Sequence, residues 1–358
     1  MHTLVVAVLV LSLGYTLVVA LLSRRHRDPT GGAPGVRVVL LVPCLNEETV
    51  IDATIERIRH LDGDVVALII DDGSVDATAE KVRAAIPSMG GRLSLFQRTP
   101  PDARRGKGAA LNAALAHLAG SPLAEGHSAD DIIVGVLDAD GRLDPAALEE
   151  VVPFFADPAV GAVQTGVRMY NAHANMISRL QDVEFVIYTE IFQKGRQALG
   201  SSGLGGNGQF ARLSALQSLG PEPWTDCLTE DLDLGIRLLV TGWKNRFCGT
   251  TAVSQQAVVQ VRRWLRQRTR WFQGNLQCLG RIPAILTSPK LTMRAAVDLV
   301  IQLLNPALTL LTSLLPALAI GGLVASAVTH PAWLIESITA SHGLFLLAAY
   351  VLAMGMAP

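Results

Sequence analysis

The stretch Ile132-Ile133-Val134-Gly135-Val136-Leu137-Asp138-Ala139-Asp140 decides the fold that this sequence predicts. Its apolar part has the length of a strand and is rich in β-branched residues, which is typical of a strand buried on both faces of a parallel sheet. Because side chains on extended backbone alternate between the two faces, Asp138 and Asp140 are expected to point the same way and repel each other. A hard divalent ion such as Mg²⁺ or Mn²⁺, shared with substrate phosphates, would relieve this repulsion. Taken alone, an Asp-x-Asp pair more often simply ends a strand and begins a turn.

Strand-like apolar runs and helical patterns alternate on both sides of this stretch. Besides the run that begins at Ile132, strands are predicted at 36–42, 65–70, 93–97 and 160–167, and helices at 47–61, 76–85, 106–119 and 145–155. This alternation favours an α/β fold with a Rossmann-like, mostly parallel sheet and flanking helices. In such a sheet, ligands bind beyond the carboxyl ends of the strands.

The composition separates a polar middle from an apolar C-terminal part. The chain has 358 residues and a formal net charge of −1, so no bulk charge indicates a nucleic-acid partner. From residue 296 to residue 358 only Asp298 and Glu336 are charged. The cysteines lie far apart without a Cys-x-x-Cys pair, which indicates neither a zinc site nor a disulfide framework.

Apolar segments at both ends predict a multi-pass membrane protein. Thr3 to Leu22 is uncharged and about as long as the roughly 20 residues that cross a bilayer, and a membrane anchor is favoured over a signal peptide because no cation precedes it. The cations Arg24, Arg25 and Arg27 follow at once and mark a cytoplasmic flank. We therefore expect a transmembrane helix at 1–23, a linker at 24–35, a cytoplasmic catalytic domain at 36–280, an interfacial segment at 281–298 and a C-terminally incomplete transmembrane region at 299–358.

Polar motifs follow two further predicted strands at the ligand-binding edge. The strand that ends at Ile70 leads into Asp71-Asp72-Gly73-Ser74, which is either a tight turn or a carboxylate pair that contacts a nucleoside. Lys107 stands in a cationic, glycine-containing loop before a helix, where it could neutralise phosphate oxygens or remain a solvated surface lysine. The spacing of this loop does not match a P-loop, which argues against ATP hydrolysis of that kind.

Two motifs after residue 175 point to an acceptor and a base. A long helix is predicted at 175–199, and it leads into the glycine-rich segment 200–208, where Gly206-Asn207-Gly208 is expected to contact an acceptor. Thr229-Glu230-Asp231 has the pattern of a capped helix start, and it could also supply Asp231 as a general base. A helix N-terminus lowers the pKa of such a carboxyl whereas burial raises it, so the sequence leaves the balance open.

A basic and aromatic helix is predicted from Arg262 to Trp271. Gln267, Arg270 and Trp271 are three and four residues apart and would share one helix face. Basic helices that carry Trp also bind membrane surfaces, and the two roles are compatible.

These motifs, taken in order behind a membrane anchor, resemble those of the processive family 2 glycosyltransferases, which include cellulose, hyaluronan and poly-N-acetylglucosamine synthases. The resemblance is carried by Asp71-Asp72, Asp138-Ala139-Asp140, Thr229-Glu230-Asp231 and Gln267-Arg268-Thr269-Arg270-Trp271. It covers roughly residues 36–277 and implies a GT-A-type fold with transmembrane and interfacial helices. Each motif is weak by itself, whereas the ordered set is highly specific.

The resemblance implies a role for each matching position. It implies a donor site for a UDP-sugar made by Asp71, Asp72, Lys107, Asp138, Asp140, Gln267, Arg270 and Trp271. Asp140, with Asp138, would hold Mg²⁺ or Mn²⁺, and Asp231 would be the catalytic base. Trp271 would also cap the acceptor site, for which Gly206, Asn207, Gly208 and Glu230 are the other candidates.

The implied activity is inverting transfer of a hexosyl or N-acetylhexosaminyl group. The acceptor hydroxyl would attack the anomeric carbon opposite UDP, so an α-linked donor would give a β-linked product. We expect a growing polysaccharide as acceptor, with membrane lipids as further partners. Two alternatives stay open: a non-processive enzyme that glycosylates a lipid, and a non-catalytic nucleotide-binding membrane scaffold.

Overall fold

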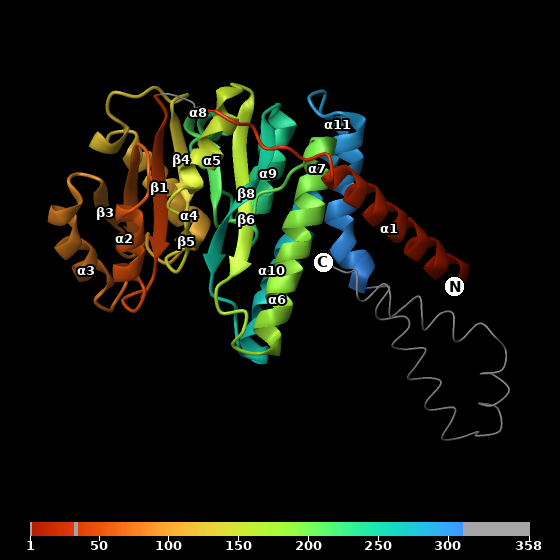
Figure 1. Ribbon diagram of the computed structural model, residues 1–358, viewed down its shortest axis with the longest axis horizontal. Helices are drawn as coiled ribbons and strands as arrows, with labels where there is room; N and C mark the ends of the chain where they lie inside the picture. Colours follow the sequence, from red (N-terminus) through yellow and green to blue (C-terminus); the bar gives the residue numbers. More distant parts are fainter. Residues whose placement is uncertain (1, 32–34, 311–358) are drawn as a thin grey trace, which may run out of the picture.

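The computed structural model of the chain describes residues 2–31 and 35–310. Part of the expected linker, residues 32–34, and residues 311–358 of the expected transmembrane region lie outside the described residues. The described part forms a central sheet with helices on both faces and a group of further helices to one side (Figure 1).

The sheet has eight strands within the described ranges, in the order β3-β2-β1-β4-β7-β6-β8-β5. The strands are β1 Arg37–Cys44, β2 Val65–Asp71, β3 Leu93–Gln97, β4 Ile132–Val136, β5 Arg142–Leu143, β6 Val160–Met169, β7 Gln209–Arg212 and β8 Lys244–Gln255. The arrowheads of β1, β6 and β8 point to the same edge of the sheet (Figure 1).

The sheet contains both parallel and antiparallel pairs, so the predicted α/β sheet is present but is less uniformly parallel than expected. β1, β2, β3 and β4 pair in parallel, as do β6 and β8, but β7 runs antiparallel to both β4 and β6, and β5 runs antiparallel to β8. The sequence analysis predicted none of β5, β7 and β8. The first two are short, and β8 begins with the polar residues Lys244, Asn245 and Arg246, which hide its apolar pattern.

Helices cover both faces of the sheet. One face packs against α2 Ile51–Arg59, α3 Thr78–Ala85 and α5 Ala147–Val151, and the other against α4 Lys107–Leu118, α8 Leu213–Gln217 and α9 Glu230–Thr241. The predicted helix at 47–61 begins only at Ile51 because the preceding loop pairs with the loop after β2. In that pairing the backbone N–H of Asn46 donates to Ser74 Oγ, and that of Glu47 donates to Thr78 Oγ1.

The long helix predicted at 175–199 is present, and its middle widens into a π-helix. It consists of α6 Met176–Ile187, the π-helix η4 Tyr188–Gln193 and α7 Lys194–Leu199. Short 3₁₀ segments lie at Ile86–Met89, Pro122–Ala124, Val152–Ala156 and Leu279–Arg281. The predicted basic helix is α10 Val261–Cys278, and α11 Ile282–Thr287 follows in the expected interfacial segment.

Helices stand at both expected membrane segments. α1 His2–Ser23 covers the predicted anchor, but its described apolar part, Val10–Ser23, is shorter than a full span. Within the described residues one helix, Met293–Leu310, is long and apolar enough to cross a membrane. One such helix is weak support for a membrane protein, because buried helices of soluble proteins have the same length and composition. The expected multi-pass topology stays a prediction.

Gly135 in the central strand β4 tests how tightly the core is packed. A Cβ at this position would lie 2.7 Å from Leu40 Cδ2 and 2.8 Å from Phe210 Cε1. We predict that Gly135→Ala lowers the free energy of unfolding by about 1–3 kcal/mol, because overpacking a filled core forces its neighbours to move. Gly120→Ala is the matched control, because a Cβ added to Gly120 would meet no neighbouring atom within 4 Å. Equal thermal unfolding of both variants would contradict this account of the core.

Candidate active site

Lys107 links two of the predicted motifs at the carboxyl edge of the sheet. It is the first residue of α4, and its Nζ lies 2.5 Å from Asp138 Oδ1 and donates to the Gly206 carbonyl oxygen at 3.1 Å. Burial disfavours its charge, but the carboxylates of Asp138, Glu230 and Asp231 outweigh burial and raise the pKa of Lys107. The lysine therefore stays charged amid acids from two segments, the turn after β4 and the first turn of α9.

The glycine-rich segment lies between Lys107 and the predicted base. The Asn207 side-chain oxygen accepts a hydrogen bond from the Asp138 backbone N–H at 3.1 Å. Gly206 has a φ of +67°, and a Cβ there would lie only 2.9 Å from Asp231 Oδ2. A residue without a side chain is therefore needed where the backbone passes the carboxylate of Asp231.

Asp231 has the proton affinity that a general base needs. It stands in the first turn of α9, where its Oδ1 accepts the Leu232 backbone N–H at 2.8 Å. Burial, reinforced by the Glu230 carboxylate, raises the pKa of Asp231 to about 7, while Lys107 acts in the opposite direction. Burial and like charge thus outweigh the helix N-terminus, which resolves the balance that the sequence left open.

Asp138 and Asp140 lie just beyond the strand rather than on it. β4 ends at Val136, and the Gly141 N–H donates to the Asp138 carbonyl at 2.8 Å, so the two acids stand in a turn. The expectation that both extend a strand was wrong in this detail, yet they remain close enough to interact. Burial raises the pKa of Asp140, and Asp138 raises it further, although Asp140 Oδ2 accepts the Gln256 N–H at 3.0 Å.

Glu47 belongs to the same acidic cluster, and the sequence analysis missed it. Burial raises the pKa of Glu47, and the carboxylates of Asp140, Asp138 and Asp76 raise it further. The available signal was position, because Glu47 lies just beyond the carboxyl end of β1, at the same edge of the sheet where Asp71 ends β2. Among the described residues, no group of three or more His, Cys, Asp or Glu side chains is arranged to hold a metal ion. A cluster of mutually repelling carboxylates still fits Mg²⁺ or Mn²⁺, which take one or two carboxylates and complete their shell with substrate phosphates.

Asp71 and Asp72 are buried and already have partners. Asp71 accepts from the Ser74 N–H and from Gln97 Nε2, both at 2.9 Å, and Asp72 forms an ion pair with Arg98. These bonds fix the turn after β2, which is the first of the two interpretations offered above. The predicted donor role for this pair remains a prediction.

The predicted residues of α10 lie on the helix that packs against the start of α9. Gly274 of α10 lies so close to Thr229 that a Cβ would come within 2.6 Å of the Thr229 backbone nitrogen. The Trp271 ring meets Phe185 of α6 edge-on at 6.1 Å, and Arg270 is exposed. No hydrogen bond or ion pair among residues 2–31 and 35–310 joins Gln267, Arg270 or Trp271 to Asp138, Asp140 or Asp231.

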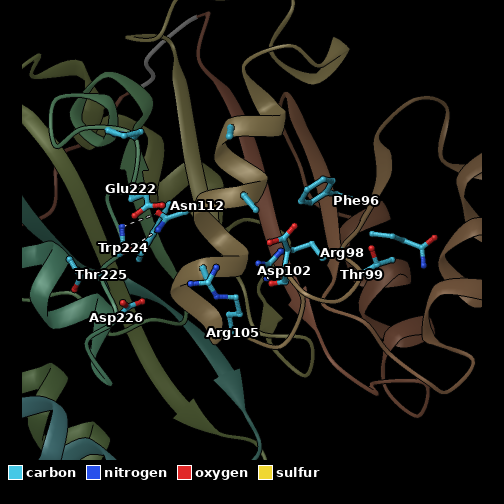
Figure 2. A pocket seen from close by; sticks show the side chains of 15 residues that line it. Phe96, Arg98, Thr99, Asp102, Arg105, Asn112, Glu222, Trp224, Thr225 and Asp226 are labelled. Atoms are coloured by element: carbon cyan, nitrogen blue, oxygen red, sulfur yellow. Dashed lines mark hydrogen bonds between the residues drawn. The ribbon is translucent and has the colours of Figure 1, made fainter.

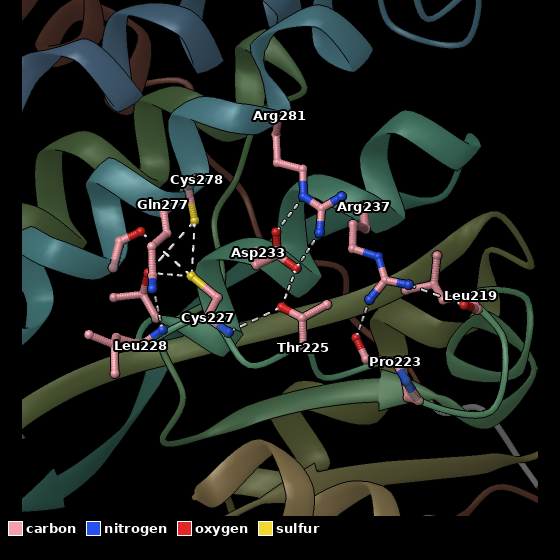
Figure 3. Close-up of polar contacts among 12 residues, drawn as sticks. Leu219, Pro223, Thr225, Cys227, Leu228, Asp233, Arg237, Gln277, Cys278 and Arg281 are labelled. Carbon is pink, nitrogen blue, oxygen red and sulfur yellow. Dashed lines mark hydrogen bonds and ion pairs between the residues drawn. The ribbon is translucent and has the colours of Figure 1, made fainter.

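A second polar network fixes the helix that carries Asp231. The Arg281 guanidinium holds both carboxylate oxygens of Asp233, at 2.6 and 3.1 Å, and Thr225 Oγ1 donates to Asp233 Oδ2 at 2.8 Å (Figure 3). The sulfur atoms of Cys227 and Cys278 lie 3.6 Å apart in the same region, and all four cysteines are free. These contacts hold the first turn of α9 against the C-terminal end of α10.

A cleft of about 750 Å³ runs beside α4 (Figure 2). Arg98, Arg105 and Asp226 line it together with the aromatic residues Phe96 and Trp224. Its described lining includes none of Asp138, Asp140 and Asp231, so it is a neighbouring hollow rather than the acidic cluster itself.

Comparisons with known proteins identify the family. The model described as Glycosyl transferase family 2 matches residues 39–219, and that described as Glycosyl transferase family group 2 matches residues 133–356. The chain belongs to glycosyltransferase family 2. Membership of family 2, expected from the motifs, is thereby confirmed, whereas the narrower expectation of a processive synthase is not. The expected α/β fold is the one described above.

The curated relatives differ from the processive synthases named above. The β-monoglucosyldiacylglycerol synthase of Synechocystis sp. is 34% identical over 68% of this chain and 49% of its own length, and that of Trichormus variabilis is 32% identical over 86% and 62%. The chain thus spans roughly half to three fifths of the length of these relatives. A probable glucomannan 4-β-mannosyltransferase of rice is 26% identical over 70% of this chain and 45% of its own length. These relatives support family 2 but not the cellulose, hyaluronan or poly-N-acetylglucosamine synthases in particular.

A solved structure shares the fold over nearly the whole chain. The mannosyltransferase of Pyrobaculum calidifontis in complex with GDP-mannose and Mn²⁺ has a TM-score of 0.69 and 19% identity, and the match covers 98% of this chain and 97% of the other. At this identity the likeness establishes the fold alone.

Proposed function

We propose that this protein transfers a sugar from a UDP-sugar to a membrane lipid, with inversion at the anomeric carbon. The observation that carries the proposal is Asp231, whose pKa is raised to about 7 and whose carboxylate faces Gly206 beside Lys107. The lipid acceptor was the alternative in the sequence analysis, and the diacylglycerol-glycosylating relatives support it better than the polysaccharide.

The donor would bind along the carboxyl edge of the sheet. In this proposal Asp71 and Asp72 lie nearest the nucleoside, Lys107 neutralises a diphosphate oxygen, and Asp140 with Asp138 holds Mg²⁺ or Mn²⁺. The bound ion would supply electrostatic stabilisation of the negative charge on the leaving diphosphate. Mn²⁺ in the structural neighbour supports a divalent ion without deciding which one.

The chain's own groups then account for the displacement. Asp231 accepts the proton of the acceptor hydroxyl, and the oxygen forms a bond to the anomeric carbon as the bond to UDP breaks on the opposite face. Lys107 stabilises the charge that develops on UDP. Gly206, Asn207, Gly208 and Glu230 would border the acceptor, with Gln267 and Arg270 toward the diphosphate and Trp271 over the acceptor site.

A polysaccharide product is the second candidate. The glucomannan 4-β-mannosyltransferase relatives at 26% identity favour it. The two candidates differ in product size, since a lipid glycosyltransferase adds one sugar or very few. In either case we propose that the catalytic domain lies on the cytoplasmic face of a membrane.

We predict that membranes or purified full chain incubated with UDP-sugars and diacylglycerol release UDP and form a glycolipid. Asp231→Asn is expected to lower this rate about 10²–10⁴-fold, because the amide cannot accept the proton. Asp226→Asn, at an exposed acid of the preceding loop, is the control. Undiminished UDP release by the Asp231 variant would favour the non-catalytic scaffold, and a polymer product would favour the second candidate.

The pKa of Asp231 predicts how activity depends on pH. Below about pH 7 the base is increasingly protonated, so kcat should fall toward tenfold per pH unit. Glu230 raises this pKa, so Glu230→Gln should move the midpoint of the kcat profile to lower pH. Glu222→Gln, an exposed glutamate, should leave the midpoint in place. An unshifted midpoint in the Glu230 variant would exclude Asp231 as the titrating base.

Removal of divalent ions tests the acidic cluster. We predict that EDTA abolishes sugar transfer and that Mg²⁺ or Mn²⁺ restores it, because the clustered carboxylates need a cation to accept a diphosphate. Asp140→Asn should raise the ion concentration required for half-maximal activity, whereas the exposed Asp144→Asn should not. Full activity in excess EDTA would contradict the metal site.

A further inference from the structure

The glycine-rich loop meets a second set of polar side chains three residues before Gly206. A Cβ on Gly203 would lie 3.5 Å from Gln302 Nε2 and 3.6 Å from the Tyr188 hydroxyl. Gln193 secures the loop there, since its Nε2 donates to the Gly203 carbonyl at 2.9 Å and its Oε1 accepts the Gly203 N–H at 3.1 Å. Tyr188 and Gln193 are the first and last residues of the π-helix, a feature that often marks functional sites.

The loop connects this polar set to the proposed base. Gly203 faces Tyr188 and Gln302, and Gly206 faces the Asp231 carboxylate. Between them Leu204 is buried and Gly205 is exposed, so the accessible part of the loop carries no side chain. Burial raises the pKa of Tyr188, Arg196 acts in the opposite direction, and the carboxylates of Asp231 and Asp298 raise the pKa further.

The polar set extends to the helices expected at the membrane. Behind Tyr188, the Arg196 guanidinium lies 5.8 Å from the ring centroid, and its Nε lies 3.5 Å from Asp298 Oδ2. Asp298 also accepts from Tyr15 of α1 at 2.9 Å and from Ser201 at 2.7 Å. Asp298 and Gln302 both belong to the candidate span Met293–Leu310, and ionisable or polar groups in such helices commonly mark function.

The chemistry of this set suits an uncharged, hydroxyl-bearing group. Asp298 balances the charge of Arg196, so the set offers no net charge to an anion. The Tyr188 hydroxyl can both donate and accept, and the Gln302 amide offers a donor and an acceptor. Gln302 Oε1 is buried and has no hydrogen-bond partner within the described part of the chain, and a ligand hydroxyl would satisfy it.

We propose that Tyr188 and Gln302 form the headgroup subsite for the lipid acceptor. They hydrogen-bond the uncharged glycerol or polyol headgroup of a lipid that approaches along the 293–310 helix, and they hold its reacting hydroxyl over Gly203–Gly206 toward Asp231. This subsite rests on the proposed lipid glycosyltransferase activity. Neither residue takes part in proton transfer, so both are binding and positioning residues.

The test measures binding separately from turnover in the full chain. Isothermal titration calorimetry with 1-octanoylglycerol in detergent should show binding to the wild type, weakened about tenfold by Tyr188→Phe and by Gln302→Leu, as expected for one lost hydrogen bond. In kinetic assays the same variants should raise the KM for diacylglycerol about tenfold, with the KM for the UDP-sugar unchanged. Tyr170→Phe, whose ring packs on Arg142 at 3.4 Å, is the matched control.

Each outcome distinguishes the subsite from the wider function. Wild-type binding of 1-octanoylglycerol without sugar transfer would refute the proposed function and leave the subsite standing. Lipid glycosylation with unchanged acceptor affinity in both variants would overturn the subsite alone. Tighter binding of the phosphate ester of 1-octanoylglycerol than of the neutral lipid, or an equal rise in the KM for the UDP-sugar, would also overturn it.

Discussion

One ammonium group, that of Lys107, makes the acidic edge of this sheet possible. It contacts the Asp138 carboxylate and the Gly206 carbonyl, and the carboxylates of Glu230 and Asp231 also stabilise its charge. Without a cation there, acids from β4 and α9 would face each other across the glycine loop and repel. Its position is well determined, because the buried face of α4 packs into the core with Leu111, Ala114 and Leu118.

The same arrangement explains why the pKa of Asp231 lies near neutrality, whereas the nearby Asp138 and Asp140 are suited to binding a cation. Asp231 experiences burial and the Glu230 charge on one side and Lys107 on the other. Asp138 and Asp140 stand in a turn that repels a further negative group and favours a cation. Enzymes commonly place carboxyl groups in different environments, which gives these groups different pKa values and allows them different chemical roles.

The sequence predicted the first half of the fold well and the second half poorly. β1, β2 and β4 are mostly apolar runs, and the acids at the end of β2 and just after β4 were found for that reason. β7 has four residues and β8 begins with polar ones, so neither shows a clear period. Asp231 and Lys107 were predicted from motifs at helix starts, whereas Glu47, just beyond β1, was overlooked. The link of Tyr15 to Asp298 spans 283 residues, and only the folded chain brings such a pair together.

The antiparallel strand β7 divides the sheet into two parts that carry different proposed binding residues. It lies between β4 and β6 in the sheet. Within the described chain, its hydrogen bonds to these two strands are the only strand pairing that joins β1 to β4 with β6 and β8. The first half carries the acids proposed for the nucleotide and the ion, and the second carries Asp231 of α9, the proposed base, and Tyr188 of η4, proposed to hold the acceptor headgroup. A fold joined in this way can change what it glycosylates by altering its second half, while the machinery for the activated sugar is inherited intact.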